Sequence, residues 1–416
     1  MEPGSPSSTN LLNNAFARFP ALSHRNFRLI WFGQMVSFAG TQMQSIAINW
    51  QIYLLTSSAL FLGLVGISRL VPILIFSMFG GIVADTHDRR KIMFVTQTTM
   101  MLSATALGLL TFLHVENPFF ILLLTGVTAA ASAFDAPARQ SLIPNIVPRE
   151  HLMNAMSLNN MMVQVASIAG PALGGFVIAG LGVSVVYWFN AASFLAVILA
   201  LAAMRLEGLP QRNRANVNFA SLIEGLRFVR HNSMVLSTML LDFFATFFAS
   251  ANALMPVFAR DILHVGAEGL GILYSAESIG ALIAGTGVSI LGEMRRKGRT
   301  LLLAVGVYGL ATALYGFSGN FFLSILFLML VGAGDAVSTI LRSTIRQVIT
   351  PDELRGRMTA ANMIFFMGGP QLGNFEAGLL AATIGAPLSV VVGGVATVLF
   401  VALVAWQYPQ LRRYDA

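Results

Sequence analysis

Long apolar runs dominate the sequence and limit its fold more than any other feature. A helix that crosses a bilayer needs about 20 consecutive, mostly apolar residues. Twelve runs fall near that length or exceed it: residues 27–55, 58–84, 91–113, 118–134, 152–181, 184–204, 234–258, 270–291, 300–317, 321–341, 358–384 and 387–406. The runs are continuous, whereas the strands of a membrane barrel alternate apolar and polar residues. We therefore predict an all-α integral membrane protein with twelve transmembrane helices.

The composition excludes several other classes of protein. Only 10% of the residues are charged, against roughly 25% in a soluble domain, so the exterior of a soluble protein could not be covered. The sequence has no cysteine, which excludes disulfides, thiolate metal sites and thiol nucleophiles. Its six histidines lie outside the apolar runs, and no Walker A sequence occurs. We expect no metal, no cofactor and no enzymatic activity.

The basic residues predict the orientation in the membrane. Of the 25 Lys and Arg residues, all but Arg69 and Arg260 fall in segments that twelve spans would place on one side. Arg342 and Arg346 are among them, in the loop expected after the tenth run. Because cytoplasmic loops are enriched in Lys and Arg, both termini are expected in the cytoplasm, and the membrane is expected to be a bacterial inner membrane. The net charge of +7 comes from these loops, so nucleic acid is not an expected partner.

The sequence divides into two similar halves. Residues 1–204 hold the first six runs and residues 232–416 hold the last six, separated by a polar linker of residues 205–231. Apolar residues recur at helical spacing over 219–230, which predicts an amphipathic helix on the cytoplasmic surface, or alternatively a solvated loop helix. Two six-helix repeats are typical of a transporter whose substrate site lies between them. One chain is enough for this fold, so we expect a monomer.

Short glycine and proline motifs repeat at equivalent places in the halves. The fifth run contains Gly-Pro-x-x-Gly and the eleventh contains the same pattern. Glycine lets two helices approach closely in a membrane. We therefore expect helix packing at these residues: Gly170, Pro171, Gly174, Gly369, Pro370 and Gly373.

Several of these motifs resemble those of the major facilitator superfamily of transporters. The loop after the second run has the pattern Gly81-x-x-x-Asp85-x-x-x-Arg89-Arg90, which is similar to the signature of that superfamily, although Thr86 and Asp88 depart from it. The Gly-Pro-x-x-Gly-Gly of the fifth run looks like its exporter-type motif. Segments 134–140 and 148–150 are similar to the enterobactin-exporter and macrolide-efflux branch. The resemblance implies the major facilitator fold, with two halves that rock around a central site.

The resemblance also implies a gate at the cytoplasmic end. Asp85 would face the positive N-terminal end of the eleventh span, and Arg89 would pair with Asp135 at the end of the fourth. Gly81 would allow close helix contact, and Arg90 and Arg139 would complete the charged group. The alternative is a solvated loop that only sets the topology.

Five ionisable residues lie within the apolar runs, where charges are costly and mark pathways or pairs by default. They are Arg69, Asp242, Glu277, Asp335 and Glu376. We expect Asp335 or Asp242 to carry a coupled proton, because the seventh and tenth spans line the cavity in the resembled superfamily. Glu277 and then Glu376 are the next candidates. The alternative for each acid is a fixed hydrogen bond between helices.

The single base within the runs, Arg69, has two expected partners. It either forms an ion pair with Glu376 in one conformation or contacts an anionic substrate in another, and a purely structural pair is the alternative. A polar stripe on the first span and one asparagine of the second half are expected to face the substrate cavity, unless they only join helices: Gln34, Gln42, Ser45, Asn49 and Asn252.

These observations predict a secondary transporter. The proposed activity is proton-coupled export of an amphipathic small molecule, such as a drug or a siderophore, by alternating access within the lipid bilayer. Uptake of a metabolite, or flipping of a lysolipid-like substrate, is the alternative on the same fold. A membrane enzyme or a sensor fits less well, because no catalytic constellation and no extra domain occur in the sequence.

Overall fold

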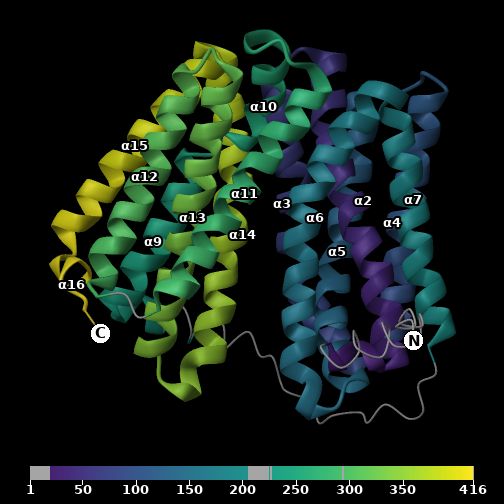
Figure 1. The fold of residues 1–416 in the computed structure, drawn as a ribbon, viewed down its shortest axis with the longest axis horizontal. Helices are drawn as coiled ribbons and strands as arrows, with labels where there is room; N and C mark the ends of the chain where they lie inside the picture. Colours follow the sequence, from purple (N-terminus) through teal and green to yellow (C-terminus); the bar gives the residue numbers. More distant parts are fainter. Residues whose placement is uncertain (1–18, 205–223, 225–226, 293–294, 416) are drawn as a thin grey trace, which may run out of the picture.

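The structure is a computed structural model that describes residues 19–204, 224, 227–292 and 295–415. Within these residues the chain forms long helices in two groups (Figure 1). The first group consists of α2 (Arg25–Thr56), α3 (Ala59–Thr86), α4 (Arg89–Phe112), α5 (Pro118–Ile146), α6 (Leu152–Leu181) and α7 (Val183–Ala203). The second consists of α9 (Ser233–Phe248), α11 (Gly266–Leu291), α12 (Lys297–Phe317), α13 (Phe321–Ile349), α14 (Arg355–Ile384) and α15 (Ala386–Gln407).

Short elements complete the described fold. The seventh span does not end with α9 but continues through η3 (Asn252–Leu254), α10 (Met255–Val257) and a π-helix, η4 (Phe258–Ile262). The remaining pieces lie next to the long helices: η1 (Pro20–Ser23), η2 (Arg149–His151), η5 (Asp352–Leu354) and α16 (Pro409–Arg412). Ten helical segments of the described chain are long and apolar enough to cross a membrane, and α2 and α14 are the more polar long helices beside them. Most of the amphipathic helix predicted over 219–230 lies outside the described residues.

Equivalent helices of the two groups begin and end with the same capping residues. Asn117 caps α5 by accepting a hydrogen bond from the N–H of Phe119, and Asn320 caps α13 in the same way. An asparagine oxygen satisfies N–H groups that the first turn of a helix leaves open. Gly182 ends α6 with φ +91° and Gly385 ends α14 with φ +87°, a region that favours glycine. The repeat seen in the sequence therefore extends to helix starts and ends.

Two helices are longer than the apolar runs indicated. α5 continues to Ile146 rather than ending near residue 134, and α13 continues to Ile349 rather than residue 341. The expectation that Arg342 and Arg346 lie in a loop is therefore wrong, and Arg139 likewise lies within a helix. Their charges ended the apolar runs, but charged residues with partners can extend a helix beyond the apolar segment.

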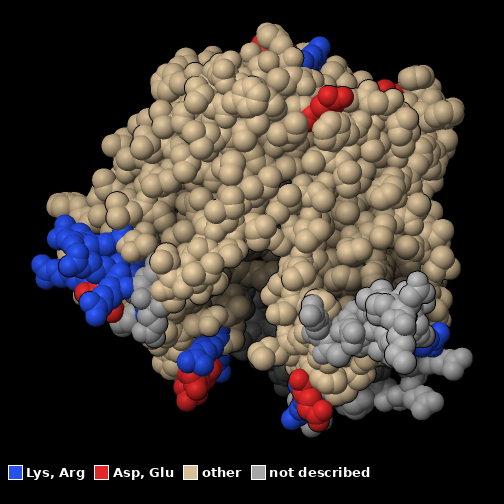
Figure 2. Space-filling view, in the orientation of Figure 1, with Lys and Arg blue, Asp and Glu red and all other residues tan. Residues whose placement is uncertain are grey.

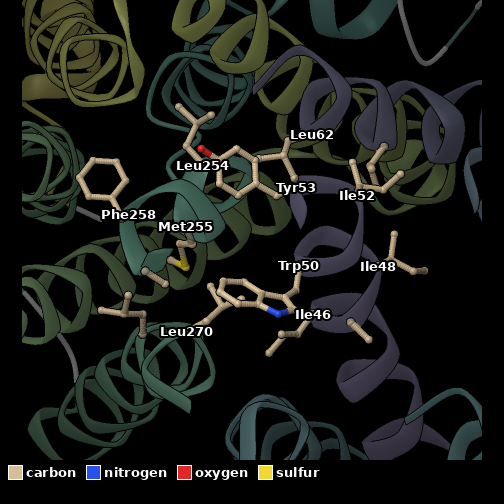
Figure 3. Close-up of a cluster of buried hydrophobic side chains, with 14 of the residues drawn as sticks. Ile46, Ile48, Trp50, Ile52, Tyr53, Leu62, Leu254, Met255, Phe258 and Leu270 are labelled. Carbon is tan, nitrogen blue, oxygen red and sulfur yellow. The ribbon is translucent and has the colours of Figure 1, made fainter. Parts of the chain in front are cut away.

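The halves separate at one end of the molecule and pack together at the other. Figure 2 shows a hollow between them at the end where Lys and Arg side chains gather. At the opposite end, buried side chains of α2 and α3 meet those of η3, α10, η4 and α11 in one apolar cluster that includes Trp50, Leu254 and Phe258 (Figure 3). This cluster closes the space between the halves on that side.

Candidate functional site

A cavity lies between the two halves, with about 1140 Å³ of empty space when its open mouth is included, and its walls come from both halves. Most of the polar groups that line it lie on five elements: α2, α3, η3, α11 and α14. α12 and α13 contribute one polar group each, and apolar side chains such as Leu62, Val65 and Leu328 fill the spaces. Thr246 of α9 and Ser250 after it add two hydroxyl groups, so the full polar lining consists of Gln42, Ser45, Asn49, Arg69, Thr246, Ser250, Asn252, Tyr274, Glu277, Tyr308, Asp335, Gln371 and Asn374.

Of the residues expected from the sequence to contact substrate or carry a proton, seven line this cavity: Gln42, Ser45, Asn49, Arg69, Asn252, Glu277 and Asp335. Three others do not. Gln34 lies in a small separate pocket between α2, α5 and α6, Asp242 is buried beside α13, and Glu376 lies on α14 outside the cavity lining. The lining residues that the sequence did not indicate include Tyr274 and Tyr308, since tyrosine produces no break in hydropathy.

Arg69 occupies the first-half wall of the cavity. Its guanidinium donates a hydrogen bond to Ser45 Oγ at 3.1 Å. Among the described residues, the ion pairs involve other bases, and Arg69 has no carboxylate within 4.0 Å. The expected pair with Glu376 is therefore not formed in this conformation. A guanidinium in the cavity wall without a counter-charge is available to bind an anionic group of a ligand.

A chain of hydrogen bonds connects the two walls. Asn49 of α2 donates to the hydroxyl of Tyr274 on α11 at 3.1 Å, and that hydroxyl donates to the backbone carbonyl of Asn252 at 2.8 Å. The amide of Asn252 lies 3.5 Å from Glu277 Oε1. Glu277 has no basic partner among the described ion pairs. The second-half wall thus presents a carboxylate that is held by an amide rather than by a cation.

A buried charge cluster lies behind the second-half wall, between α9 and α13. Asp242 of α9 lies 3.1 Å from one guanidinium nitrogen of Arg342 and 3.4 Å from one of Arg346. Arg342 also lies 3.6 Å from Asp335, and Arg346 donates to the side chain of Asn362 on α14. Arg342 and Arg346 are only 1% and 5% exposed. They are helix residues that neutralise acids, which corrects their assignment to a loop.

The corresponding group in the first half has a different arrangement from the one that the resemblance implied. Asp135 of α5 accepts hydrogen bonds from Thr96 and Gln97 at 3.0 Å and lies 3.6 Å from Arg139, one helical turn away. Arg89 donates to the carbonyl of Ser141. In the described ion pairs the partner of Asp135 is therefore Arg139, not Arg89, because both lie on the same face of α5.

The loop motif after α3 is only partly described. The side chain of Asp85 lies outside the described part of the structure, so its contact with α14 stays a prediction. Arg90 donates to the carbonyl of Ala202 at 3.0 Å. The position of a Cβ on Gly81 has open space around it, whereas a Cβ on Gly80 would meet the backbone of Ala133. The close helix contact expected at Gly81 therefore occurs one residue earlier.

The repeated glycines lie where helices of the same half approach each other. A Cβ on Gly174 would come within 3.0 Å of Met43 Cα in α2, and Gly170 faces Gln42 of the same helix. In the second half, a Cβ on Gly373 would come within 2.7 Å of the Thr246 carbonyl in α9, and Gly369 also faces α9. Pro171 and Pro370 lie inside their helices, and Pro370 lines the cavity.

Comparison with known proteins identifies the group to which this arrangement belongs. Residues 16–416 match the family described as transmembrane secretion effector, a branch of the major facilitator superfamily. The chain belongs to this family. Its major facilitator fold and its membership among non-enzymatic transporters follow from the match and from the structural neighbours.

Named relatives of this major facilitator protein are exporters. The chain is 26% identical over 398 residues to the multidrug efflux pump Tap of Mycolicibacterium fortuitum, which covers 93% of this chain and 96% of that one. It is 26% identical over 392 residues to the enterobactin exporter EntS of Salmonella typhimurium, which covers 94% of each. These relatives extend over nearly the whole chain.

Solved structures share the fold at low sequence identity. A bacterial homologue of the human lysosomal transporter Spinster, in an inward-facing and unoccupied conformation, aligns with a TM-score of 0.72 at 15% identity and covers 94% of this chain and 97% of its own. A bacterial homologue of the iron transporter ferroportin, in an inward-facing state, aligns with a TM-score of 0.70 at 14% identity, over 94% and 99% of the two chains. At these identities the likeness concerns the fold alone.

Proposed function

We propose that the protein exports an amphipathic small molecule across an energised membrane in exchange for protons, by opening its central cavity to each side in turn. The observation that carries this proposal is the polar cavity between two six-helix halves, which is open at one end and closed at the other by the apolar cluster. The sequence holds no Walker A motif, so an ion gradient is the proposed source of energy. A single chain contains both halves, and it functions as a monomer.

The open end faces the cytoplasm in this proposal. Lys and Arg side chains gather at that end (Figure 2), and cytoplasmic loops of inner-membrane proteins are enriched in these residues. Both termini then lie in the cytoplasm, and the conformation described is inward-facing. Substrate enters from the cytoplasm in this state, which is the state that an exporter needs for loading.

The relatives support export, and the lining weighs against a lipid substrate. The Tap and EntS relatives are named for efflux and export. A site for a lysolipid needs a long apolar wall for the acyl chain, whereas thirteen of the residues that line this cavity carry amide, hydroxyl or ionisable groups. Uptake by the same cavity remains the competing direction, and the transport assay below separates the two.

Glu277 is the residue that we propose as the proton carrier, ahead of Asp335 and Asp242. A carrier has to change its charge during the cycle. Asp242 lies between two arginines at 3.1 and 3.4 Å, and Asp335 lies 3.6 Å from Arg342; a neighbouring positive charge favours the ionised form of a carboxyl group. Glu277 lines the cavity with only an amide partner, so its proton can be exchanged at lower cost.

Transport in proteoliposomes with an imposed pH gradient tests the proposal. The purified chain, reconstituted with a panel of macrolides, lipophilic cations and catecholates, should move at least one class against its gradient when the pH gradient is present. Glu277→Gln should abolish this concentrative transport and leave substrate exchange without a gradient when the substrate is saturating. Glu268→Gln, at an exposed position on the same helix, serves as the matched control and should keep both activities.

Two results would count against parts of the proposal. Accumulation in the opposite direction would establish uptake. Loss of concentrative transport in Asp335→Asn together with full coupling in Glu277→Gln would move the proton carrier to Asp335.

A further inference from the structure

The two walls of the cavity carry opposite unpaired charges. On the first-half wall, Arg69 has a hydroxyl partner, Ser45, and no carboxylate partner among the described residues. On the second-half wall, Glu277 has an amide partner, Asn252, at 3.5 Å, and no described basic residue forms an ion pair with it. The cavity therefore separates a positive from a negative charge across the boundary between the halves.

The other charges near the cavity do not cancel this separation. Asp335 also faces the cavity, but Arg342 lies 3.6 Å from its carboxylate. Behind it, Arg342 and Arg346 enclose Asp242. In this group two acids balance two bases, so the net charge of the second-half wall is that of Glu277. The first-half wall carries the charge of Arg69.

Apolar side chains line the same cavity as the two charged groups. Leu62 and Val65 of α3 and Leu328 and Val331 of α13 line the same cavity. A ligand that spans the cavity can reach a guanidinium from one half, a carboxylate from the other half and apolar side chains of both. Guanidinium binds carboxylates and phosphates through two parallel hydrogen bonds, whereas the carboxylate suits an amine.

We propose that the substrate is a zwitterion with an apolar body, whose anionic group binds Arg69 and whose cationic group binds Glu277. This inference rests on the proposed function and specifies the substrate class of its site. The two ends of such a ligand satisfy both unpaired charges at once and connect one half of the protein to the other. A cation alone leaves Arg69 without a counter-charge in a partly desolvated site, and an anion alone does the same for Glu277, which is costly in a membrane interior.

The binding mode has a consequence for coupling. A substrate amine and a proton both neutralise the carboxylate of Glu277, so they compete for it. When the site faces the noncytoplasmic side, a proton displaces the amine end, and only the contact with Arg69 has to break for release. Exchange of proton for substrate then requires no second titratable group.

Equilibrium binding to the purified full-length chain in detergent tests the charge requirement without any gradient. The probes are unbranched ω-amino acids of increasing chain length, with the alkylamine and the alkanoate of each length as single-charge controls, and the readout is ligand-induced thermal stabilisation. At the length that fits the cavity, the ω-amino acid should bind more tightly than both controls. Loss of one charge-assisted contact should weaken binding by about tenfold to a hundredfold.

Substitutions then assign each end of the ligand. Arg69→Gln should reduce the affinity for the ω-amino acid to that for the alkylamine, and Glu277→Gln should reduce it to that for the alkanoate. Arg69→Lys should restore part of the preference, because the charge is kept and the fork geometry is lost. Arg149→Gln, at an exposed arginine of the first half, is the matched control and should change nothing.

Three outcomes would overturn the proposal. Alkylamines that bind as tightly as ω-amino acids, with no effect of Arg69→Gln, would show a cation site. Alkanoates that bind as tightly, with no effect of Glu277→Gln, would show an anion site. No stabilisation by any chain length would exclude the zwitterion. Because binding is measured without a gradient, a failure of proton coupling leaves these results unchanged, and the two proposals fail separately.

Discussion

Arg342 is the residue on which the buried charges of the second half depend. It lies within ion-pair distance of both Asp242 and Asp335 while being only 1% exposed. Removing one member of a buried charge group leaves the others uncompensated, at a cost of about 3–5 kcal/mol. The group therefore holds α9 against α13 and fixes the orientation of the cavity-facing Asp335.

Arg342→Gln should lower the free energy of unfolding by about 3 kcal/mol or more, because Asp242 keeps only Arg346 and Asp335 keeps no base. Denaturant unfolding in detergent measures the change. Arg355→Gln is the control, since its partner Asp352 is exposed and surface pairs contribute about 1 kcal/mol at most. Equal effects of the two substitutions would show that the buried group contributes no more to the free energy of unfolding than a surface ion pair does.

Arg69 should show the opposite behaviour in the absence of ligand. Its charge has no carboxylate partner among the described residues, so Arg69→Gln removes an uncompensated charge and should raise the free energy of unfolding by about 1–3 kcal/mol. Thermal unfolding of the ligand-free protein checks this. A loss of stability instead would mean that Arg69 holds the fold, and that its role is not that of a ligand contact.

A histidine pair near the start of the described chain predicts a pH effect. His24 Nε2 lies 2.9 Å from His151 Nδ1, and burial, with a smaller contribution from the charge of His151, lowers the pKa of His24. A histidine with a lowered pKa in the folded state binds fewer protons than in the unfolded state, so the stability of this contact is present above about pH 6.5 and decreases below it. The protection factors of the η1 amides, in which the intrinsic pH dependence of amide exchange is divided out, should therefore decrease as the pH falls below that value, and His24→Gln should flatten the dependence.

At the scale of single residues, the sequence indicated the charges but not their pairing. Arg69, Glu277 and Asp335 stood out because ionisable groups interrupt apolar runs. Arg342 and Arg346 were missed for the same reason, since hydropathy ended the run before them. Partners distant in sequence, such as Asp242 with Arg342, are brought together only by tertiary packing.

At the scale of elements, glycines mark the contacts between the halves. A Cβ on Gly175 of α6 would lie 2.9 Å from the Cα of Gly271 in α11, and a Cβ on Gly378 of α14 would lie 2.8 Å from the Cα of Gly63 in α3. These two contacts occupy equivalent positions in the repeat. Backbone surfaces without side chains can approach closely and move past each other in a membrane.

Gly175→Ala should impair transport while the chain still folds, because the added methyl group meets backbone and overpacking costs about 1–3 kcal/mol. Gly180→Ala is the control on the same helix, where a Cβ has open space. Transport rate and thermal stability should be measured for both variants. Unchanged transport in Gly175→Ala would show that α6 and α11 tolerate a wider separation.

The helices themselves were largely predictable from the sequence. Hydropathy located each long helix, because a bilayer requires an apolar length and internal hydrogen bonds. It did not locate the ends of α5 and α13, or the interruption after α9, where apolar residues continue through η3 and the π-helix η4. Residue type alone does not distinguish a regular apolar helix from an interrupted one.

At the scale of the whole molecule, the sequence indicated two halves but not which end is open. The same helices form both open states, and their free energies differ by only a few kcal/mol, so interfacial contacts decide the conformation. At the closed end, Tyr53 of α2 donates a hydrogen bond to Asp261 of η4, and the guanidinium of Arg260 lies 5.6 Å from the centre of the Tyr53 ring. These polar contacts join the two halves next to the apolar cluster.

Asp261→Asn should weaken closure at this end, because it removes a charge-assisted hydrogen bond between the halves. Such a bond contributes about 1.5–3 kcal/mol, so the population open at this end should rise by about tenfold or more.

The chain has no cysteine, so a single Leu254→Cys in the buried cluster is an unambiguous reporter. Its reaction with a membrane-impermeant maleimide, added from the side of the closed end, should become faster in the Asp261→Asn background, and Tyr53→Phe should have a similar effect. A cysteine at the exposed Glu268 should react equally in all backgrounds. If the rate at residue 254 does not change, the apolar cluster alone holds this end closed.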